Sequence, residues 1–211
     1  MRVSRDKLEA FAAACRQAAQ HALVRCSSGN MSARLDEHHM LIKASRAWMA
    51  DMTPDDVALC RIADQAPLNA KHPSVEIGFH AGVLRTRPDV NVVLHFQSSA
   101  ATALACSTDL PSINFFVIPE MAYYIGPVAI VPYLLPGSAM LADAVVAAMK
   151  DHDMAILRNH GQVTAGKDYA DAIQKAAFFE LASHIILHTP QRASALSPSA
   201  IAQLRSAGRG A

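Results

Sequence analysis

The chain has 211 residues, of which 52% are hydrophobic and 18% charged, and its formal net charge is +1 at pH 7. This length suits one ordinary domain with a substantial core, and we expect a single domain over residues 1–211. The sequence has no basic block and no stripe of alternating basic and aromatic residues. Its composition therefore argues against a nucleic-acid-binding or membrane-binding surface.

The cysteines and the N-terminus indicate a reducing compartment. Cys15, Cys26, Cys60 and Cys106 lack the C-x-x-C spacing of zinc knuckles and redox pairs, and we expect them to be buried thiols. The first 23 residues carry charges where a signal peptide is apolar. No uncharged apolar run approaches the roughly 20 residues of a membrane span. We therefore expect a cytoplasmic protein.

The first half of the chain predicts one helix, three strands and a second helix. Apolar residues at helical spacing predict an amphipathic helix over residues 5–24. Ser74 is the predicted N-cap of a helix that runs to about Arg85, where the segment RPD stops it. The three strands are expected in SSGNMSARL, HHMLIKAS and DVALCRI.

The second half alternates strands and helices. The predicted strands are VNVVLHFQ, INFFVI, AIVPYL and MAILRNHG, and the predicted helices are Ser98 to Cys106, SAMLADAVVAAMKD and DYADAIQKAAFFELASHIILH. Residues 190–211 are predicted to be a loose tail with one short helix. This alternation predicts a layered α/β fold.

Four polar residues at the ends of predicted elements are candidates for chemistry. His95 and Gln97 alternate along one strand and therefore share a face, and His160 lies where another strand stops. Glu76 lies in the first turn of the Ser74 helix. Because ligands commonly bind beyond strand ends in α/β sheets, two imidazoles and a carboxylate there can hold a divalent metal with an open position.

Each of these residues also has a structural explanation. A lone histidine at a strand end is more often hydrogen-bonded than metal-bound. Glu76 can simply complement the helix dipole. We interpret His80, one turn after Glu76 on the same face, as a packing residue. Spacing alone leaves the metal site and the structural reading both open.

The ordered set of motifs is more specific than any single one. The segments SSGNMSAR, LIKAS, HPSVEIGFHAGVLRTRPDVNVVLHFQSS, IVPY, AILRNHGQVTAG, DYADAI and FFELAS occur in that order over roughly residues 8–188. This arrangement resembles the class II aldolase/adducin family. The resemblance implies a three-layer α/β/α fold with a central, largely antiparallel sheet. It also implies a homotetramer with sites between subunits.

The resemblance implies a role for each matched residue. His95 and His160 match two of three zinc-binding imidazoles. Glu76 matches the acidic residue that serves as general acid/base and can touch the metal in the free enzyme. The pocket for the anionic part of the substrate is assigned to Asn30, Ser45 and Ser74.

The implied function is a metal-dependent lyase of the aldolase kind. Such an enzyme cleaves a carbon–carbon bond of a hydroxy-ketone, a sugar phosphate or sugar acid, by retro-aldol chemistry through a metal-stabilised enediolate. We expect a partly desolvated Glu76 to carry out the proton transfer. The same scaffold can support decarboxylation, dehydration or epimerisation, and in adducin it is not an enzyme. These alternatives stay open.

Gln97 is the main departure from the family pattern. It stands where the family has a second imidazole in a His-x-His motif. An amide oxygen is a neutral and poorer donor to zinc than imidazole. We expect a divalent metal held by His95, Gln97 and His160, with zinc as the first expectation and manganese or magnesium as alternatives.

The predicted anion pocket departs as well. Arg46 stands where the family's sugar-phosphate enzymes commonly have glycine, and Val75 follows Ser74 in place of a second serine. A guanidinium can grip a phosphate or carboxylate in a bidentate manner, although a loop arginine more often pairs with a surface acid. These changes point to a small anionic substrate other than fuculose or rhamnulose phosphate.

The residue that would donate the second proton is also altered. Phe115 stands where some aldolases use a tyrosine, and Tyr123 and Tyr124 are the candidates to replace it.

Overall fold

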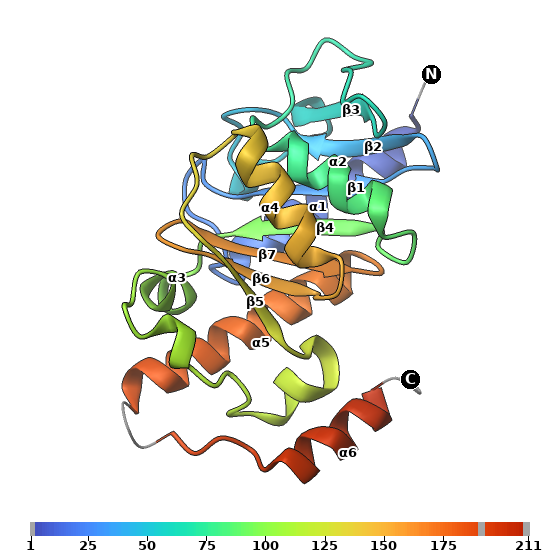
Figure 1. The fold of residues 1–211 in the computed structure, drawn as a ribbon. Helices are drawn as coiled ribbons and strands as arrows, with labels where there is room; N and C mark the ends of the chain where they lie inside the picture. Colours follow the sequence, from blue (N-terminus) through green and yellow to red (C-terminus); the bar gives the residue numbers. More distant parts are fainter. Residues whose placement is uncertain (1–2, 190–192, 209–211) are drawn as a thin grey trace.

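A seven-stranded sheet organises residues 3–189 and 193–208, which the computed structural model describes (Figure 1). The strands are β1 (Asn30–Arg34), β2 (His39–Lys43), β3 (Val57–Arg61), β4 (Val92–Phe96), β5 (Val128–Val131), β6 (Met154–Leu157) and β7 (Gly161–Gly166). Their order is β3-β2-β1-β4-β7-β6-β5, and neighbours are antiparallel except β5 and β6. The predicted α/β fold with a largely antiparallel sheet is confirmed.

Helices cover both faces of the sheet (Figure 1). Helices α1 (Arg5–Gln20), α3 (Ser99–Ala105) and α5 (Tyr169–His188) pack on one face, and α2 (Ile77–Thr86) and α4 (Ala139–Met149) pack on the other. Helix α6 (Pro198–Gly208) contacts the single π-turn η4 (Met121–Ile125). The 3-10 turns are η1 (Met49–Asp51), η2 (Pro54–Asp56) and η3 (Leu110–Ser112).

Strand β4 shows how the sequence assigns side chains to the two faces. All five of its residues are buried, as expected for a central strand with helices on both sides. Leu94 and Phe96 belong to the cluster under α1, α3 and α5, whereas Val93 belongs to the cluster under α2 and α4. Because side chains alternate, His95 lies on the face of Val93.

A carboxylate from α5 holds the start of α3. Glu180 Oε2 accepts from the Ser98 hydroxyl at 2.6 Å and from the Ala101 amide at 2.9 Å, and its Oε1 accepts from the Ala100 amide at 2.9 Å. The amides of Ala100 and Ala101 are among the backbone N–H groups that a helix N-terminus leaves without intrahelical partners. This contact fixes α3, which follows directly after β4, against α5.

Two predicted elements differ from the structure. The segment 113–118 is not a strand, because Asn114 Oδ1 accepts from the Phe116 amide at 3.0 Å in a local turn. Ser74 is not the N-cap of α2, because the helix begins at Ile77 after Glu76. The Ser74 hydroxyl instead accepts from the Glu76 amide at 3.3 Å, so it shapes the approach to the helix.

The cysteines are only partly as expected. Cys15 and Cys60 are buried, but Cys26 and Cys106 are exposed, because they lie in a turn before β1 and at the C-cap of α3. Among the described residues, no helix is both long and apolar enough to cross a membrane.

Candidate active site

The antiparallel topology brings the ends of four elements together. Asn30 at the start of β1 is paired with His95 near the end of β4. Gln162 of β7 is paired with Phe96, and His160 lies in the three-residue turn between β6 and β7. Asn159 has φ 54°, a conformation that asparagine tolerates and that this tight turn uses. Glu76 enters from the N-terminus of α2 on the same face.

A backbone contact fixes the tautomer of His95. Its Nδ1 lies 2.9 Å from the carbonyl oxygen of Gln162, which can only accept a hydrogen bond. Nδ1 therefore carries the proton and Nε2 carries the free lone pair. This Nε2 lies 3.5 Å from Glu76 Oε2. A backbone acceptor on the far nitrogen is the usual arrangement behind a metal-binding imidazole.

His160 completes a cluster of three donor atoms. Its Nε2 lies 3.5 Å from Glu76 Oε1, and its ring centroid lies 4.8 Å from that of His95. Burial, and secondarily His95, lowers the pKa of His160, while the charge of Glu76 opposes this shift. The donor atoms of Glu76, His95 and His160 all lie within 4.8 Å of one another.

The two oxygens of Glu76 have different surroundings. Oε2 accepts from Asn30 Nδ2 at 2.9 Å. Oε1 is buried and has no hydrogen-bond partner among the described residues, and the same holds for His160 Nδ1. Buried polar atoms without partners are uncommon in folded proteins and mark places where a ligand completes the structure.

Gln97 lies beside this cluster. A Cβ added at Gly161 would lie 2.8 Å from Gln97 Cγ, 3.1 Å from His95 Cε1 and 2.6 Å from the carbonyl oxygen of Phe96. The side chains of Gln97 and His95 thus flank the same glycine, next to His160. Gly161 has to be glycine because any Cβ would collide with the backbone of β4.

The loop after β2 carries the residues predicted to bind an anion. The Ser45 amide donates to the His72 carbonyl at 2.8 Å, and the Ser74 amide donates to the Lys43 carbonyl at 3.1 Å. These bonds hold the Ser45 loop against the segment that leads to Glu76. Arg46 is exposed with φ 66°, and its guanidinium has no hydrogen bond or ion pair within the described part of the chain.

Lys43 places a buried cation behind this loop. Its Nζ donates to the Ala47 carbonyl at 2.6 Å and to the Ser27 carbonyl at 3.4 Å. Burial lowers the pKa of Lys43, and no carboxylate among the described residues forms an ion pair with it. Its contacts therefore join the turns before β1 and after β2, the two segments that carry Asn30 and Ser45.

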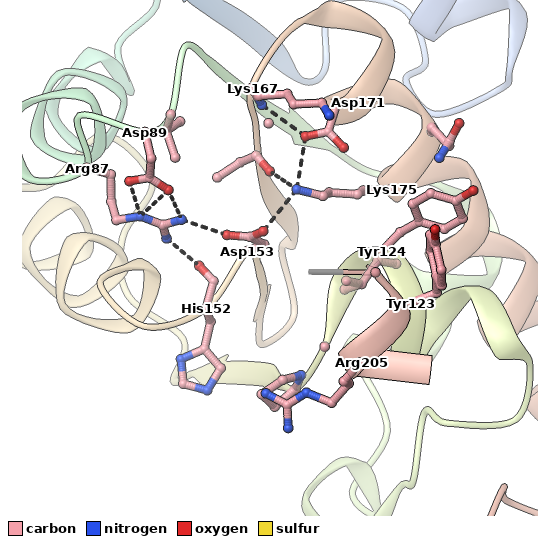
Figure 2. Close-up of a pocket in the computed structure, with 18 of the residues that line it drawn as sticks. Arg87, Asp89, Tyr123, Tyr124, His152, Asp153, Lys167, Asp171, Lys175 and Arg205 are labelled. Carbon is pink, nitrogen blue, oxygen red and sulfur yellow. Dashed lines mark hydrogen bonds and ion pairs between the residues drawn. The ribbon is translucent and has the colours of Figure 1, made fainter. Parts of the chain in front are cut away.

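The aromatic residues considered as proton donors lie elsewhere in the chain. Phe115 is buried and packs on Phe179, with ring centroids 5.1 Å apart. Tyr123 and Tyr124 line a cavity of about 870 Å³ at the opposite end of the sheet, next to Arg205 of α6 (Figure 2). Within one chain, these two tyrosines therefore lie away from Glu76, and their predicted role as proton donors stays a prediction.

The family assignment follows from sequence comparison. Residues 9–187 match the model of the Class II Aldolase and Adducin N-terminal domain. The chain belongs to the class II aldolase and adducin family. Helices α2 to α4, the whole sheet and the cluster of Glu76, His95 and His160 lie within the matched range, which also covers all but the ends of α1 and α5.

Named members of this class II aldolase family cover most of the chain. The chain is 29% identical over 183 residues to 3-oxo-tetronate 4-phosphate decarboxylase of Escherichia coli K12, covering 85% of this chain and 86% of that protein. It is 30% identical over 170 residues to L-fuculose phosphate aldolase of Methanocaldococcus jannaschii, covering 81% and 90%. The crystal structure of YgbL from Escherichia coli matches with a TM-score of 0.89 and 25% identity, covering 95% and 98%.

The donor set of this class II aldolase chain fits a divalent metal ion. A carboxylate and two imidazoles, one with its tautomer fixed and the other kept neutral by a lowered pKa, are the ligand types that zinc and related ions take. The unpartnered Glu76 Oε1 is the atom such an ion would satisfy. With Gln97 beside them, Glu76, His95 and His160 can hold a cation and leave coordination positions open for a substrate.

The sequence interpretation did not single out Ser32, and it took His80 for a packing residue only. Ser32 and His80 are fully buried and hydrogen-bonded to each other at 2.8 Å, and His80 also contacts Asn30. The spacing of Asn30 and Ser32, which puts both on one face of a strand, was the signal available in the sequence.

Proposed function

We propose that this protein is a divalent-metal-dependent carbon–carbon lyase that acts on a small anionic hydroxy-ketone or oxo acid. The observation that supports this most is the convergence of Glu76, His95 and His160, whose donor atoms lie within 4.8 Å of one another. Buried structural histidines normally have hydrogen-bond partners. In this cluster, Glu76 Oε1 and His160 Nδ1 are buried and have none among the described residues. A non-catalytic assembly module has no need for such an arrangement.

The chain's own residues can divide the chemistry between them. When bound, a divalent cation supplies a Lewis acid that draws electrons toward a substrate carbonyl oxygen. Glu76, which the resemblance lets touch the cation in the free enzyme, is the carboxylate that takes up or returns a proton when the substrate is bound. His95 and His160 would hold the cation through their ring nitrogens, and Gln97 can contribute its amide oxygen.

The anionic end of the substrate has its own binding groups. Ser45, Ser74 and the side chain of Arg46 lie on the loops next to Glu76, and Asn30 lies on the adjoining strand. The guanidinium of Arg46 is free to bind a phosphate or a carboxylate with two parallel hydrogen bonds. The buried ammonium of Lys43 adds positive charge behind the same loops.

Decarboxylation is the version of this chemistry that two observations favour. The similar Escherichia coli protein is named as a decarboxylase of a 3-oxo sugar acid phosphate. In addition, the tyrosine expected of some aldolases is replaced by the buried Phe115. Loss of carbon dioxide breaks the bond to the carboxylate carbon, leaves the electron pair in an enolate and then needs a single proton, which Glu76 can deliver. Retro-aldol cleavage of a ketose phosphate is the second candidate, favoured by the similarity to L-fuculose phosphate aldolase.

The test is a product assay on the metal-reconstituted protein. With 3-oxo-tetronate 4-phosphate, we expect release of carbon dioxide, and with L-fuculose 1-phosphate, release of an aldehyde if the second candidate holds. Glu76→Gln is expected to lower kcat by at least about 100-fold, because general acid–base catalysis contributes 10²–10⁴-fold. His184→Gln, on the exposed face of α5, is the matched control and is expected to retain full activity.

Two results would contradict the proposal. One is a protein that binds no divalent cation after reconstitution. The other is a Glu76→Gln variant that turns over as fast as the parent while its thermal melting curve is unchanged.

We also propose a homo-oligomer, as in the tetrameric arrangement that the resemblance implies. Val75 is 69% exposed directly before Glu76, and Gly137 lies against it. The segment around Gly137 exposes further large apolar side chains, namely Tyr133, Leu135 and Met140. An apolar surface beside a polar site is a common place for a second subunit. Sedimentation analysis is expected to give the mass of four chains, and a monomer at micromolar concentration would contradict this.

A further inference from the structure

A chain of buried hydrogen bonds leads from Glu76 into the protein. Asn30 Nδ2 lies 2.9 Å from Glu76 Oε2, the other end of the Asn30 amide contacts His80 Nε2, and His80 Nδ1 lies 2.8 Å from the hydroxyl of Ser32. All four side chains are buried, with at most 7% of each residue exposed. This series of hydrogen bonds lies between β1 and α2, and it ends at the Ser32 hydroxyl rather than at solvent.

The donor and acceptor roles of these atoms allow only one direction of donation along the series of hydrogen bonds. A carboxylate accepts only, so Asn30 presents its NH₂ group to Glu76 and its oxygen to His80. The amide oxygen also accepts only, so His80 Nε2 carries a proton. In a neutral imidazole Nδ1 is then the acceptor, and Ser32 donates to it. Burial, followed by the neighbouring His95, lowers the pKa of His80 well below its ordinary value, which agrees with a neutral ring.

We propose that Ser32 and His80 are positioning residues that lock the Asn30 amide and, through it, the carboxylate of Glu76. With Oε2 held by Asn30, the carboxylate plane is fixed and Oε1 is turned toward His160. The inference rests on the proposed function, since it explains how the lyase keeps its acid/base group in one orientation. Neither Ser32 nor His80 needs to touch the metal or the substrate.

The alternative is that His80 only packs. It stacks on Phe79 with ring centroids 4.6 Å apart, so a packing role has support of its own. The two roles differ in what a substitution must preserve. Packing needs volume alone, whereas positioning needs a donor toward Asn30 and an acceptor toward Ser32.

Two variants of similar volume separate these roles. His80→Gln keeps an NH group for Asn30 and an oxygen for Ser32, whereas His80→Leu keeps the volume and removes both. Calorimetric titration with Mn²⁺ and with Zn²⁺ is the main measurement. We expect the affinity of His80→Gln to stay within about 3-fold of the parent and that of His80→Leu to fall roughly 10–100-fold, the usual effect of removing a group that orients a ligand.

A spectroscopic measurement tests the direction of the chain without any metal or substrate. Nitrogen-15 NMR of the parent at pH 7 is expected to show His80 neutral, with the proton on Nε2. A proton on Nδ1, or on both nitrogens, would overturn the proposal. Equal metal affinity of a folded His80→Leu variant and the parent would also overturn it.

The remaining outcomes are separable as well. If His80→Leu fails to fold, Ser32→Ala, which removes a single oxygen, replaces it, and full affinity of that variant counts against positioning. If the parent binds neither Mn²⁺ nor Zn²⁺, the proposed function fails. The NMR tautomer and the exchange rate of the Asn30 side-chain amide then decide the positioning role alone, with slow exchange supporting it and solvent-like exchange contradicting it.

Discussion

The environment of individual atoms sets the chemistry of this site. The Gln162 carbonyl accepts a hydrogen bond from Nδ1 of His95 and leaves Nε2 facing the cluster, and Asn30 donates to one oxygen of Glu76 and leaves the other without a hydrogen bond. In both cases a neutral backbone or amide group selects which atom faces the cluster. The site is therefore organised before any ligand arrives, which reduces the cost of binding one.

The burial of His80 has a consequence for stability against acid. Because the folded state lowers its pKa, the unfolded state binds a proton more readily below its own pKa of 6.5, and stability falls as the pH falls below that value. One such group contributes a slope of up to about 1.4 kcal/mol per pH unit. We expect urea unfolding to show that His80→Gln loses less stability than the parent between pH 7 and pH 5. Equal losses would show that folding does not lower the pKa of His80.

Arg46 combines backbone strain with a free charge. Its φ of 66° suits glycine, and an L side chain there costs about 1–2 kcal/mol. Arg46→Gly is therefore expected to leave the free energy of unfolding unchanged or to raise it by about 1 kcal/mol, while inorganic phosphate binds roughly 10-fold more weakly. Arg61→Ala, an exposed arginine at the edge of the sheet, is the control for a general loss of charge. Unchanged phosphate binding by Arg46→Gly would remove Arg46 from the anion pocket.

At the scale of elements, the site depends on where strands and helices end. Asn30, His95 and His160 lie within two residues of a strand end, and Glu76 directly precedes α2. Periodicity predicted β4, β6 and α2 from the sequence, and so indicated that His95, His160 and Glu76 lie at element ends. It did not predict β7, because GQVTAG has few large apolar residues and is identified as a strand only by pairing with β4 and β6.

The contact between α5 and α3 is the element-level feature most open to test. Glu180→Gln removes the charge and one acceptor at the start of α3, where three groups donate to the carboxylate. We expect the free energy of unfolding to fall by about 1–3 kcal/mol. Glu37→Gln, at an exposed turn, serves as the control and is expected to be neutral. Denaturant unfolding of both variants measures the difference, and equal stability would mean that the cap contributes nothing.

Across the whole molecule, the two ends of the sheet differ in whether their charged and polar side chains have partners. At the end away from the site, Arg87 pairs with Asp89 and Asp153, and Lys175 pairs with Asp153 and Asp171 (Figure 2). Each of these charged side chains therefore has an ion-pair partner. At the other end, Glu76 and His160 keep polar atoms without partners. This difference supports our proposal that the chemistry takes place at the buried cluster of Glu76, His95 and His160.

The sequence indicated the fold class and three residues that converge in the structure better than it indicated the irregular segments. Glu76, His95 and His160 were identified because their residue types and order are specific to a family. The locations of Phe115, Tyr123 and Tyr124 were not predictable, because they depend on an irregular segment whose path is set by tertiary packing. The role of His80 was missed because a histidine on an apolar helix face looks the same whether it packs or orients a neighbour.

The most direct test of the whole account is anomalous diffraction from crystals of the protein grown with Mn²⁺ and, separately, with Zn²⁺. We predict one strong anomalous peak between Glu76, His95 and His160, with Gln97 Oε1 within bonding distance in the Mn²⁺ crystals. The central claim would be contradicted if the anomalous map shows no peak at this position and Glu76 Oε1 still has no partner in the refined structure.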